Sequence, residues 1–163
     1  MIRHFRPALA VLSLLLALAA PARAADIEAV DNAAMLAYPL SMVKVKAYGA
    51  ALVEYGSALK TDAALKAETE AMARDVTSLS GMAAKIAAAP HVLAFFTKHG
   101  LTAEDAVFIP VVMGTAKMAA GNPDIAQAFA ARISPAQIAF FRQHEAELHS
   151  QRWLFVDAQP QTR

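Results

Sequence analysis

The 163-residue chain contains no cysteine, and this absence excludes several kinds of chemistry at once. Disulfides, c-type haem attachment, cysteine-ligated zinc, iron–sulfur clusters and thiol nucleophiles all need this residue. A lipid anchor on cysteine is excluded for the same reason. The sequence also lacks a Gly-x-Ser-x-Gly nucleophile elbow, a P-loop and a dinucleotide-binding fingerprint. The fold must therefore be held by packing, and no catalytic motif is recognisable.

The chain also has no excess of charge of either sign. It carries 15 Lys and Arg against 14 Asp and Glu. Three of the basic residues, Arg3, Arg6 and Arg23, lie in the first 24 positions, so the rest of the chain has 12 basic and 14 acidic residues and a net charge of −2. No Lys/Arg cluster remains, and nucleic acid is therefore not an expected partner.

The first 24 residues have the pattern of a secretory signal peptide. A basic start containing Arg3 and Arg6 is followed by an apolar run over 8–20 and by the small residues Ala22 and Ala24. The apolar run is too short for a comfortable membrane span. The sequence therefore predicts cleavage after Ala24, export by the general secretory route to the periplasm or beyond, and no stable membrane insertion of the mature chain.

Two stretches, 35–59 and 65–86, place an apolar or small residue at alternating intervals of three and four. This spacing is typical of helices that pack along one face. With a short turn between them, helices over 39–60 and 63–88 are expected to pack antiparallel.

Pro39 interrupts the first stretch, so it either kinks one long helix or separates a short segment, 27–37, from it. Because the apolar spacing continues in phase across Pro39, the two pieces are expected to stay nearly collinear.

Start and stop signals predict the later helices. Pro90 and Gly100 bound a short helix over 91–99, and Thr102 begins one over 103–120 that has no polar face and should be the buried centre. Two more are predicted over 123–132 and 134–153, the second with a capping box between Ser134 and Gln137.

The predicted fold is all-α, a compact and mostly antiparallel bundle of five to six helices. It forms a single domain over 25–156, followed by a disordered tail over 157–163. The chain resembles a family of small exported all-helical bacterial proteins without an assigned function. The resemblance is carried by the segments Tyr38–Met42, Gly100–Thr102 and Ile133–Leu148. It implies the same fold and compartment, and no chemistry.

Five residues form a candidate pocket: Tyr38, Met42, Lys44, Tyr48 and His144. Tyrosine pairs an apolar ring with a polar tip, and a basic neighbour could complete a small-molecule cleft. Gly49 and Gly56 lie on the packing stripe itself, where glycine is costly, so we expect another helix or a ligand to approach closely there.

No metal site is predicted. His144 and His149 resemble the H-E-x-x-H zinc signature, but they are five residues apart and point about 140° away from each other on a helix. Haem b, held without covalent bonds by Met35 or Met42 and by His144, is the alternative cofactor.

The sequence thus predicts an exported, soluble helical protein that binds a small apolar ligand or an envelope protein. A haem-binding electron-transfer bundle is the alternative, and a hydrolase with an unrecognised site ranks last. The sequence leaves the oligomeric state open.

Overall fold

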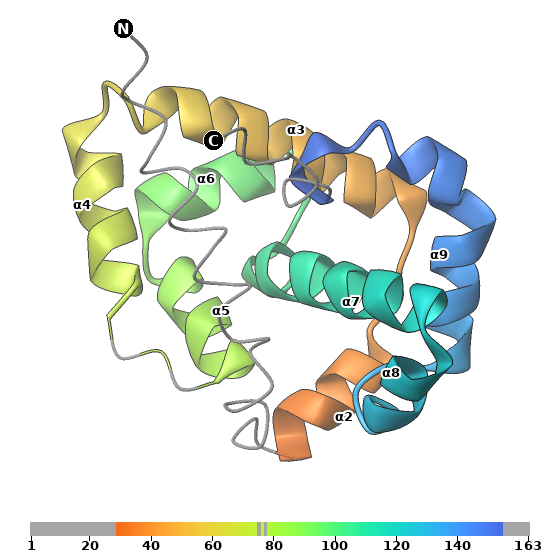
Figure 1. Ribbon diagram of the computed structural model, residues 1–163. Coiled ribbons are helices and arrows are strands. Elements are labelled where there is room, and N and C mark those ends of the chain that lie inside the picture. Colours follow the sequence, from red (N-terminus) through yellow and green to blue (C-terminus); the bar gives the residue numbers. More distant parts are fainter. Residues whose placement is uncertain (1–28, 75, 77, 155–163) are drawn as a thin grey trace, which may run out of the picture.

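The computed structural model describes residues 29–74, 76 and 78–154. Over these residues the chain is all-helical, which confirms the predicted fold class, with eight α-helices, one 3₁₀-helix and no strand (Figure 1). The predicted leader, 1–24, and the predicted tail, 157–163, lie outside the described residues. The elements are α2 (Ala29–Ala37), α3 (Met42–Ala58), α4 (Ala63–Met72), α5 (Leu79–Ala87), α6 (Pro90–Lys98), α7 (Ala103–Gly121), α8 (Pro123–Ala128), α9 (Pro135–Leu148) and η2 (Arg152–Leu154).

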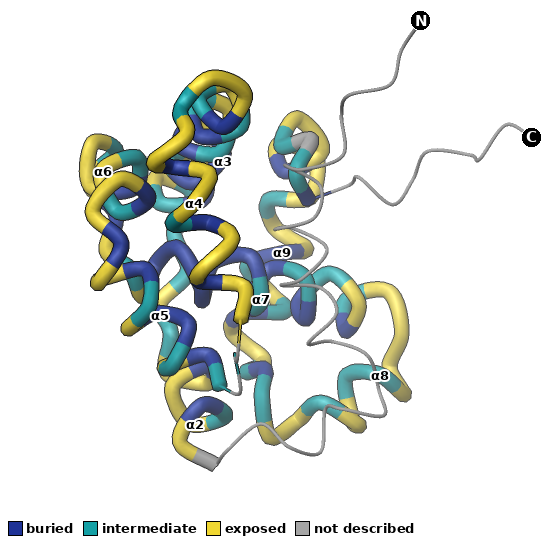
Figure 2. Tube along the Cα trace, turned by 90° about the vertical axis from the view of Figure 1, so that its left-hand side faces the viewer, coloured by how far each residue is buried: buried dark blue, intermediate teal, exposed yellow. Residues whose placement is uncertain are grey.

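Helix α7 runs through the middle of the molecule, and the other helices surround it (Figures 1 and 2). It contacts α3, α5, α6, α8, α9 and η2. Its sequence explains this position, because apolar residues cover every side and no polar face is left for solvent. Its fully buried side chains are Val107, Ile109, Val112, Met113, Ala116 and Ala119. The prediction of a buried central helix over 103–120 is confirmed, and the helix continues through Pro110.

The predicted helix over 63–88 is wrong at its centre. Helix α4 ends at Met72 and α5 begins at Leu79. The new start has two caps: Ser78 accepts the Gly81 N–H, and the buried carboxylate of Asp31, in α2, accepts the N–H groups of Leu79 and Ser80. This split, together with a separate α2, explains why the described residues form eight helices and not five or six.

The expected pairing of the first two long helices is also wrong. Helix α3 packs against α6 and α7, and α4 packs against α6 and α5. The position of the apolar stripe over 65–86 is correct, since Leu65, Met72, Leu79 and Ile86 are all buried, whereas Met42 and Leu52 of the first stripe are only half-buried. Stripe spacing shows which face of a helix is buried, but it does not identify the helix that covers that face.

Pro39 separates two helices. Helix α2 ends at Ala37, and α3 starts at Met42 with Ser41 as its N-cap. The two helices lie on opposite sides of α7, so the expectation that they are collinear is wrong (Figures 1 and 2). The link is fixed by Gln137 of α9, whose Nε2 donates to the carbonyl oxygens of Met35 at 2.8 Å and Tyr38 at 2.9 Å.

The predicted starts of the later helices and the glycine stop at Gly100 are confirmed, but α8 ends at Ala128 and not at 132. Thr102 and Ser134 each form a complete capping box, with Asp105 and Gln137 respectively. Gly100 has a φ of 73°, the left-handed conformation in which glycine ends a helix without strain.

No single helix in the described part of the chain is long and apolar enough to cross a membrane. Only α5 and α6 taken together reach that length and apolarity, and they are bent by 96° to each other.

Candidate functional site

Two residues of the predicted pocket, Tyr38 and Lys44, meet at Asp105 at the start of α7. The Tyr38 hydroxyl donates to Asp105 Oδ1 at 2.5 Å, and Lys44 Nζ donates to the same oxygen at 2.7 Å. Asp105 Oδ2 accepts the Thr102 N–H. Lys44 also lies over the Tyr38 ring, 5.5 Å from its centroid, while Phe108 stacks on that ring at 5.6 Å. The cluster joins the α2–α3 link, α3 and α7.

The electrostatics of this cluster favour a structural role. Burial raises the pKa of Tyr38, and the hydrogen bond to Asp105 raises it further. Burial also raises the pKa of Asp105, but hydrogen bonds from Lys44, Thr102 and Tyr38 bring it below its usual value. Tyr38 is therefore protonated and Asp105 ionised at neutral pH, which keeps the hydrogen bond between them intact.

Tyr48 lies at a different junction, where α3 meets α6 and η2. Its buried ring stacks on Phe96 at 6.0 Å and meets the edge of Trp153 at 4.8 Å. Burial raises the pKa of its hydroxyl. Tyr48 is therefore a core side chain that supports the Trp153 ring.

Met42 and His144 occupy further positions. Met42 is half-buried at the first residue of α3. His144 packs on Phe140 of its own helix, with ring centroids 4.7 Å apart, and its Nδ1 lies 3.7 Å from Glu147 Oε2. Met35, the other methionine named for haem, is buried in the core. The haem alternative stays a prediction that none of these contacts supports.

Among the described residues, no group of three or more His, Asp or Glu side chains is placed to hold a metal ion.

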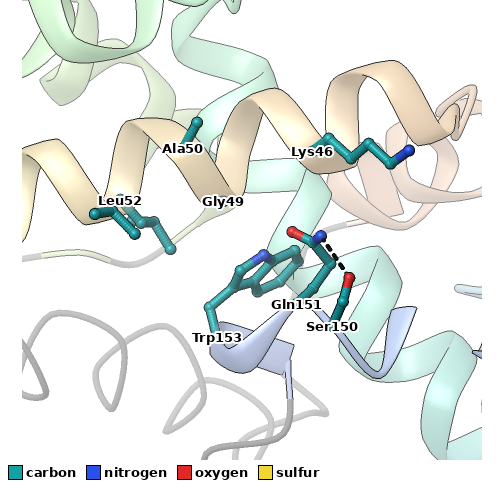
Figure 3. A pocket seen from close by; sticks show the side chains of 8 residues that line it. Lys46, Gly49, Ala50, Leu52, Ser150, Gln151 and Trp153 are labelled. Carbon is teal, nitrogen blue, oxygen red and sulfur yellow. Dashed lines mark hydrogen bonds between the residues drawn. The ribbon is translucent and has the colours of Figure 1, made fainter. Parts of the chain in front are cut away.

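A cleft between α3 and the C-terminal segment 150–153 is the better candidate site (Figure 3). Its volume is about 440 Å³, within the ~300–1,000 Å³ typical of ligand sites. One end is apolar, with Leu52, Val53 and the Trp153 ring, and the other carries the polar groups of Lys46 and Gln151. The lining residues are Lys46, Gly49, Ala50, Leu52, Val53, Ser150, Gln151 and Trp153.

Gly49 lets the C-terminal segment approach α3. A Cβ placed on Gly49 would lie 2.6 Å from Gln151 Oε1 and 3.1 Å from Trp153 Nε1, too close for ordinary contact. The expectation of a close approach at Gly49 is confirmed, and the approaching element is η2 with the residues before it. Gly56 is half-buried, and its close approach stays a prediction.

The polar end of the cleft is fixed by hydrogen bonds within the protein. Gln151 Nε2 donates to Ser150 Oγ at 3.2 Å, the bond drawn in Figure 3, and Ser150 Oγ donates to the Glu147 carbonyl. Glu147 also pairs with Lys46. The hydrogen bond from Lys46 lowers the pKa of Glu147, which therefore stays ionised.

Sequence reasoning identifies Gly49 but misses the other residues of the cleft. The predicted last helix extends to Trp153, whereas α9 ends at Leu148 and Trp153 belongs to η2. The glycine on the packing stripe is the available signal, because it marks where another segment approaches. Comparisons of the chain with protein-family models, curated proteins and solved structures find no match.

Proposed function

We propose that the protein is an exported binding module that takes a small apolar ligand in the cleft between α3 and residues 150–153. The observation that carries this proposal is a cleft of about 440 Å³ whose apolar end combines Leu52 and Val53 with the ring of Trp153. A large aromatic ring beside aliphatic side chains offers a ligand much apolar contact area.

The test uses N-phenyl-1-naphthylamine, an apolar fluorescent probe. Trp153 is the only tryptophan, so energy transfer from tryptophan to bound probe reports binding close to the cleft. Val53→Glu places a charge at the apolar end and should weaken probe binding about tenfold, because a charge is poorly accommodated in apolar contact.

Val43→Glu is the matched control. Val43 and Val53 lie on the same helix and are 80% and 72% exposed, but only Val53 lines the cleft. The control should bind the probe like the wild type. Equal affinities in all three proteins would contradict binding in this cleft.

A second candidate function, binding of an envelope protein, is favoured by the outer face of α3. Val43, Lys46, Ala50 and Val53 follow one another at intervals of three, four and three, and all four are exposed. This is the spacing by which two helices pack along a shared seam. Large exposed apolar side chains grouped on one face are typical of interaction sites.

The two functions respond differently to the same substitutions. Val43→Glu and Val53→Glu should both abolish contact with a partner protein, whereas only Val53→Glu affects the small ligand. A photo-reactive residue is placed at position 50 and crosslinking is carried out in living cells that export the protein. One crosslinked product is expected, and it should be absent when either Val43→Glu or Val53→Glu is also present. A product that persists in both would argue against this face.

A further inference from the structure

The Trp153 side chain fills a narrow slot whose walls are Gly49 and Tyr48. Trp153 Nε1 and Cδ1 would lie 3.1 and 3.3 Å from a Cβ on Gly49, so the half-buried ring packs closely on the Gly49 backbone and a side chain there would push it away. On another side, the edge of the ring meets Tyr48 at 4.8 Å with an interplanar angle of 69°. The shape of this slot therefore suits a flat ring.

The indole N–H of Trp153 finds no hydrogen-bond partner in the part of the chain that the structure describes. Its nitrogen, Nε1, is buried. A buried indole N–H normally donates a hydrogen bond to a protein acceptor. An indole N–H without an acceptor loses its hydrogen bond to water on burial and gains none in exchange, which costs free energy. Turning the ring out to solvent would restore hydrogen bonding to water, and this gain offsets part of the free energy that exposing the apolar ring costs.

The segment that carries Trp153 is anchored at its far end, where Leu154 is buried in the core, and is held by short-range hydrogen bonds before it. Residues 150–154, named here the strap, contain the three-residue helix η2, and short 3₁₀ segments have weak hydrogen-bond geometry. Gln151 N and Leu154 N bond to carbonyls only three residues away. The strap is connected to α7 by the hydrogen bond from Lys117 Nζ to the Leu154 carbonyl at 2.9 Å.

We propose that Trp153 is a displaceable gate, and that the slot it fills is the inner part of the binding site. An uncharged flat aromatic ring on the ligand takes the place of the indole against Gly49 and Tyr48, while the strap carries Trp153 outwards and the apolar side chains of α3 in the cleft stay in contact with the rest of the ligand. This inference rests on the proposed function, because the ligand reaches the slot through the cleft. It narrows the ligand class from apolar molecules in general to molecules with an aromatic ring.

The gate can be tested without any ligand. Gly49→Ala adds a Cβ that collides with Gln151 and Trp153, whereas Gly114→Ala, in α7, adds one with no atom within 4 Å. The first variant should shift Trp153 emission to the red and raise its acrylamide quenching about twofold, since local opening exposes the ring. The second should match the wild type, and equal quenching in both variants would overturn the gate.

The ligand class is tested with benzyl alcohol, which has a flat ring, and hexan-1-ol, which has none. Benzyl alcohol should shift wild-type Trp153 emission to the red. It should bind Trp153→Ala about fivefold more tightly by calorimetry, because that variant no longer spends binding energy on displacing the indole. Hexan-1-ol should do neither, and circular dichroism melting would verify that Trp153→Ala is folded.

The outcomes separate the two proposals. If both alcohols bind the wild type while Trp153 stays shielded from acrylamide, the binding function stands and the gate is overturned. If neither alcohol binds the wild type or Trp153→Ala, both the cleft function and the aromatic subsite are overturned. This conclusion holds whether or not Gly49→Ala changes the quenching of Trp153.

Discussion

The carboxylate of Glu68 accepts two hydrogen bonds from His91, one from its backbone N–H at 2.9 Å and one from its Nδ1 at 2.6 Å. It also accepts the Val92 N–H at 3.1 Å. The residue before α6, Ala89, offers no side-chain cap, so a glutamate from α4 takes over that role at the start of α6. This contact makes the pairing of α4 with α6 dependent on pH.

Both partners have shifted pKa values. The hydrogen bond and charge of Glu68 raise the pKa of His91 above its ordinary 6.5, with a smaller contribution from Asp62. Burial raises the pKa of Glu68, but the bonds from His91 and Val92 outweigh this and bring it below its ordinary 4.5. The stabilisation from His91 is complete below pH 6.5 and is lost as the pH rises through its pKa in the folded protein. That from Glu68 is complete above pH 4.5 and is lost as the pH falls through its folded pKa.

The contact should therefore stabilise the fold most between pH 4.5 and 6.5. We predict that Glu68→Gln lowers the melting temperature most in this window, and less at pH 8. Thermal unfolding by circular dichroism across this pH range measures the difference. Glu70→Gln, an exposed carboxylate on the same helix, is the control and should show no such window. A constant Glu68→Gln effect from pH 4.5 to 8 would contradict the assignment.

Replacing Asp31 should lower the free energy of unfolding more than the loss of a helix cap usually does. Asp31→Ala leaves the buried N–H of Leu79 unpaired, which costs about 1–3 kcal/mol, and also removes the part-buried hydrogen bond from the Ser80 N–H. We expect a loss of about 2–4 kcal/mol in the free energy of unfolding, measured with urea. Ser78→Ala removes only the local cap of the same helix and should cost about 1 kcal/mol. The reverse order would show that the long-range cap is the weaker one.

Replacing Gln137 should give a similar loss of stability at the other end of α2. Gln137→Met keeps the size of the side chain but loses the bonds to the carbonyls of Met35 and Tyr38 and the capping-box bond from the Ser134 N–H, with an expected cost of about 1–3 kcal/mol. The exposed Gln143 lies on the same helix, and Gln143→Met should change the free energy of unfolding by less than about 0.5 kcal/mol. Equal effects would mean that the buried amide contributes little.

If the protein is exported as proposed, cleavage of the leader should give the mature protein a defined new N-terminus. When the chain is expressed with its own leader, the protein recovered from the periplasm should begin at Ala25 by N-terminal sequencing. Ala24→Phe should prevent processing, because signal peptidases accept only small residues at that position. Protein that keeps Met1, or that stays in the cytoplasm with the wild-type leader, would contradict the export proposal.

The signals that sequence reasoning interprets correctly are local. Thr102, Ser134 and Gly100 act within one helical turn of their own positions, and the residues around each are enough to predict its role. The burial of α7 is also predictable, because its own composition leaves no polar face.

The errors come from contacts between distant residues. Asp31 stabilises the start of α5 across 48 positions, so the stripe over 65–86 gives no sign that its helix breaks. The cleft is missed for the same reason. Gly49 indicates that some segment comes close, but only the folded chain places Gln151 and Trp153 there. Tyr38 and Lys44 are predicted to line a pocket, but in the folded chain they meet at the carboxylate of Asp105.

The amide of Gln137 has a consequence for the order in which the protein is made. It binds carbonyl groups 102 and 99 positions earlier in the chain. Synthesis runs from the N-terminus, so these two hydrogen bonds can form only after α9, the last described α-helix, has been made. Contacts of such long range slow folding. If the chain is exported as proposed, the link around Pro39 would gain these two hydrogen bonds only after residue 137 had crossed the membrane.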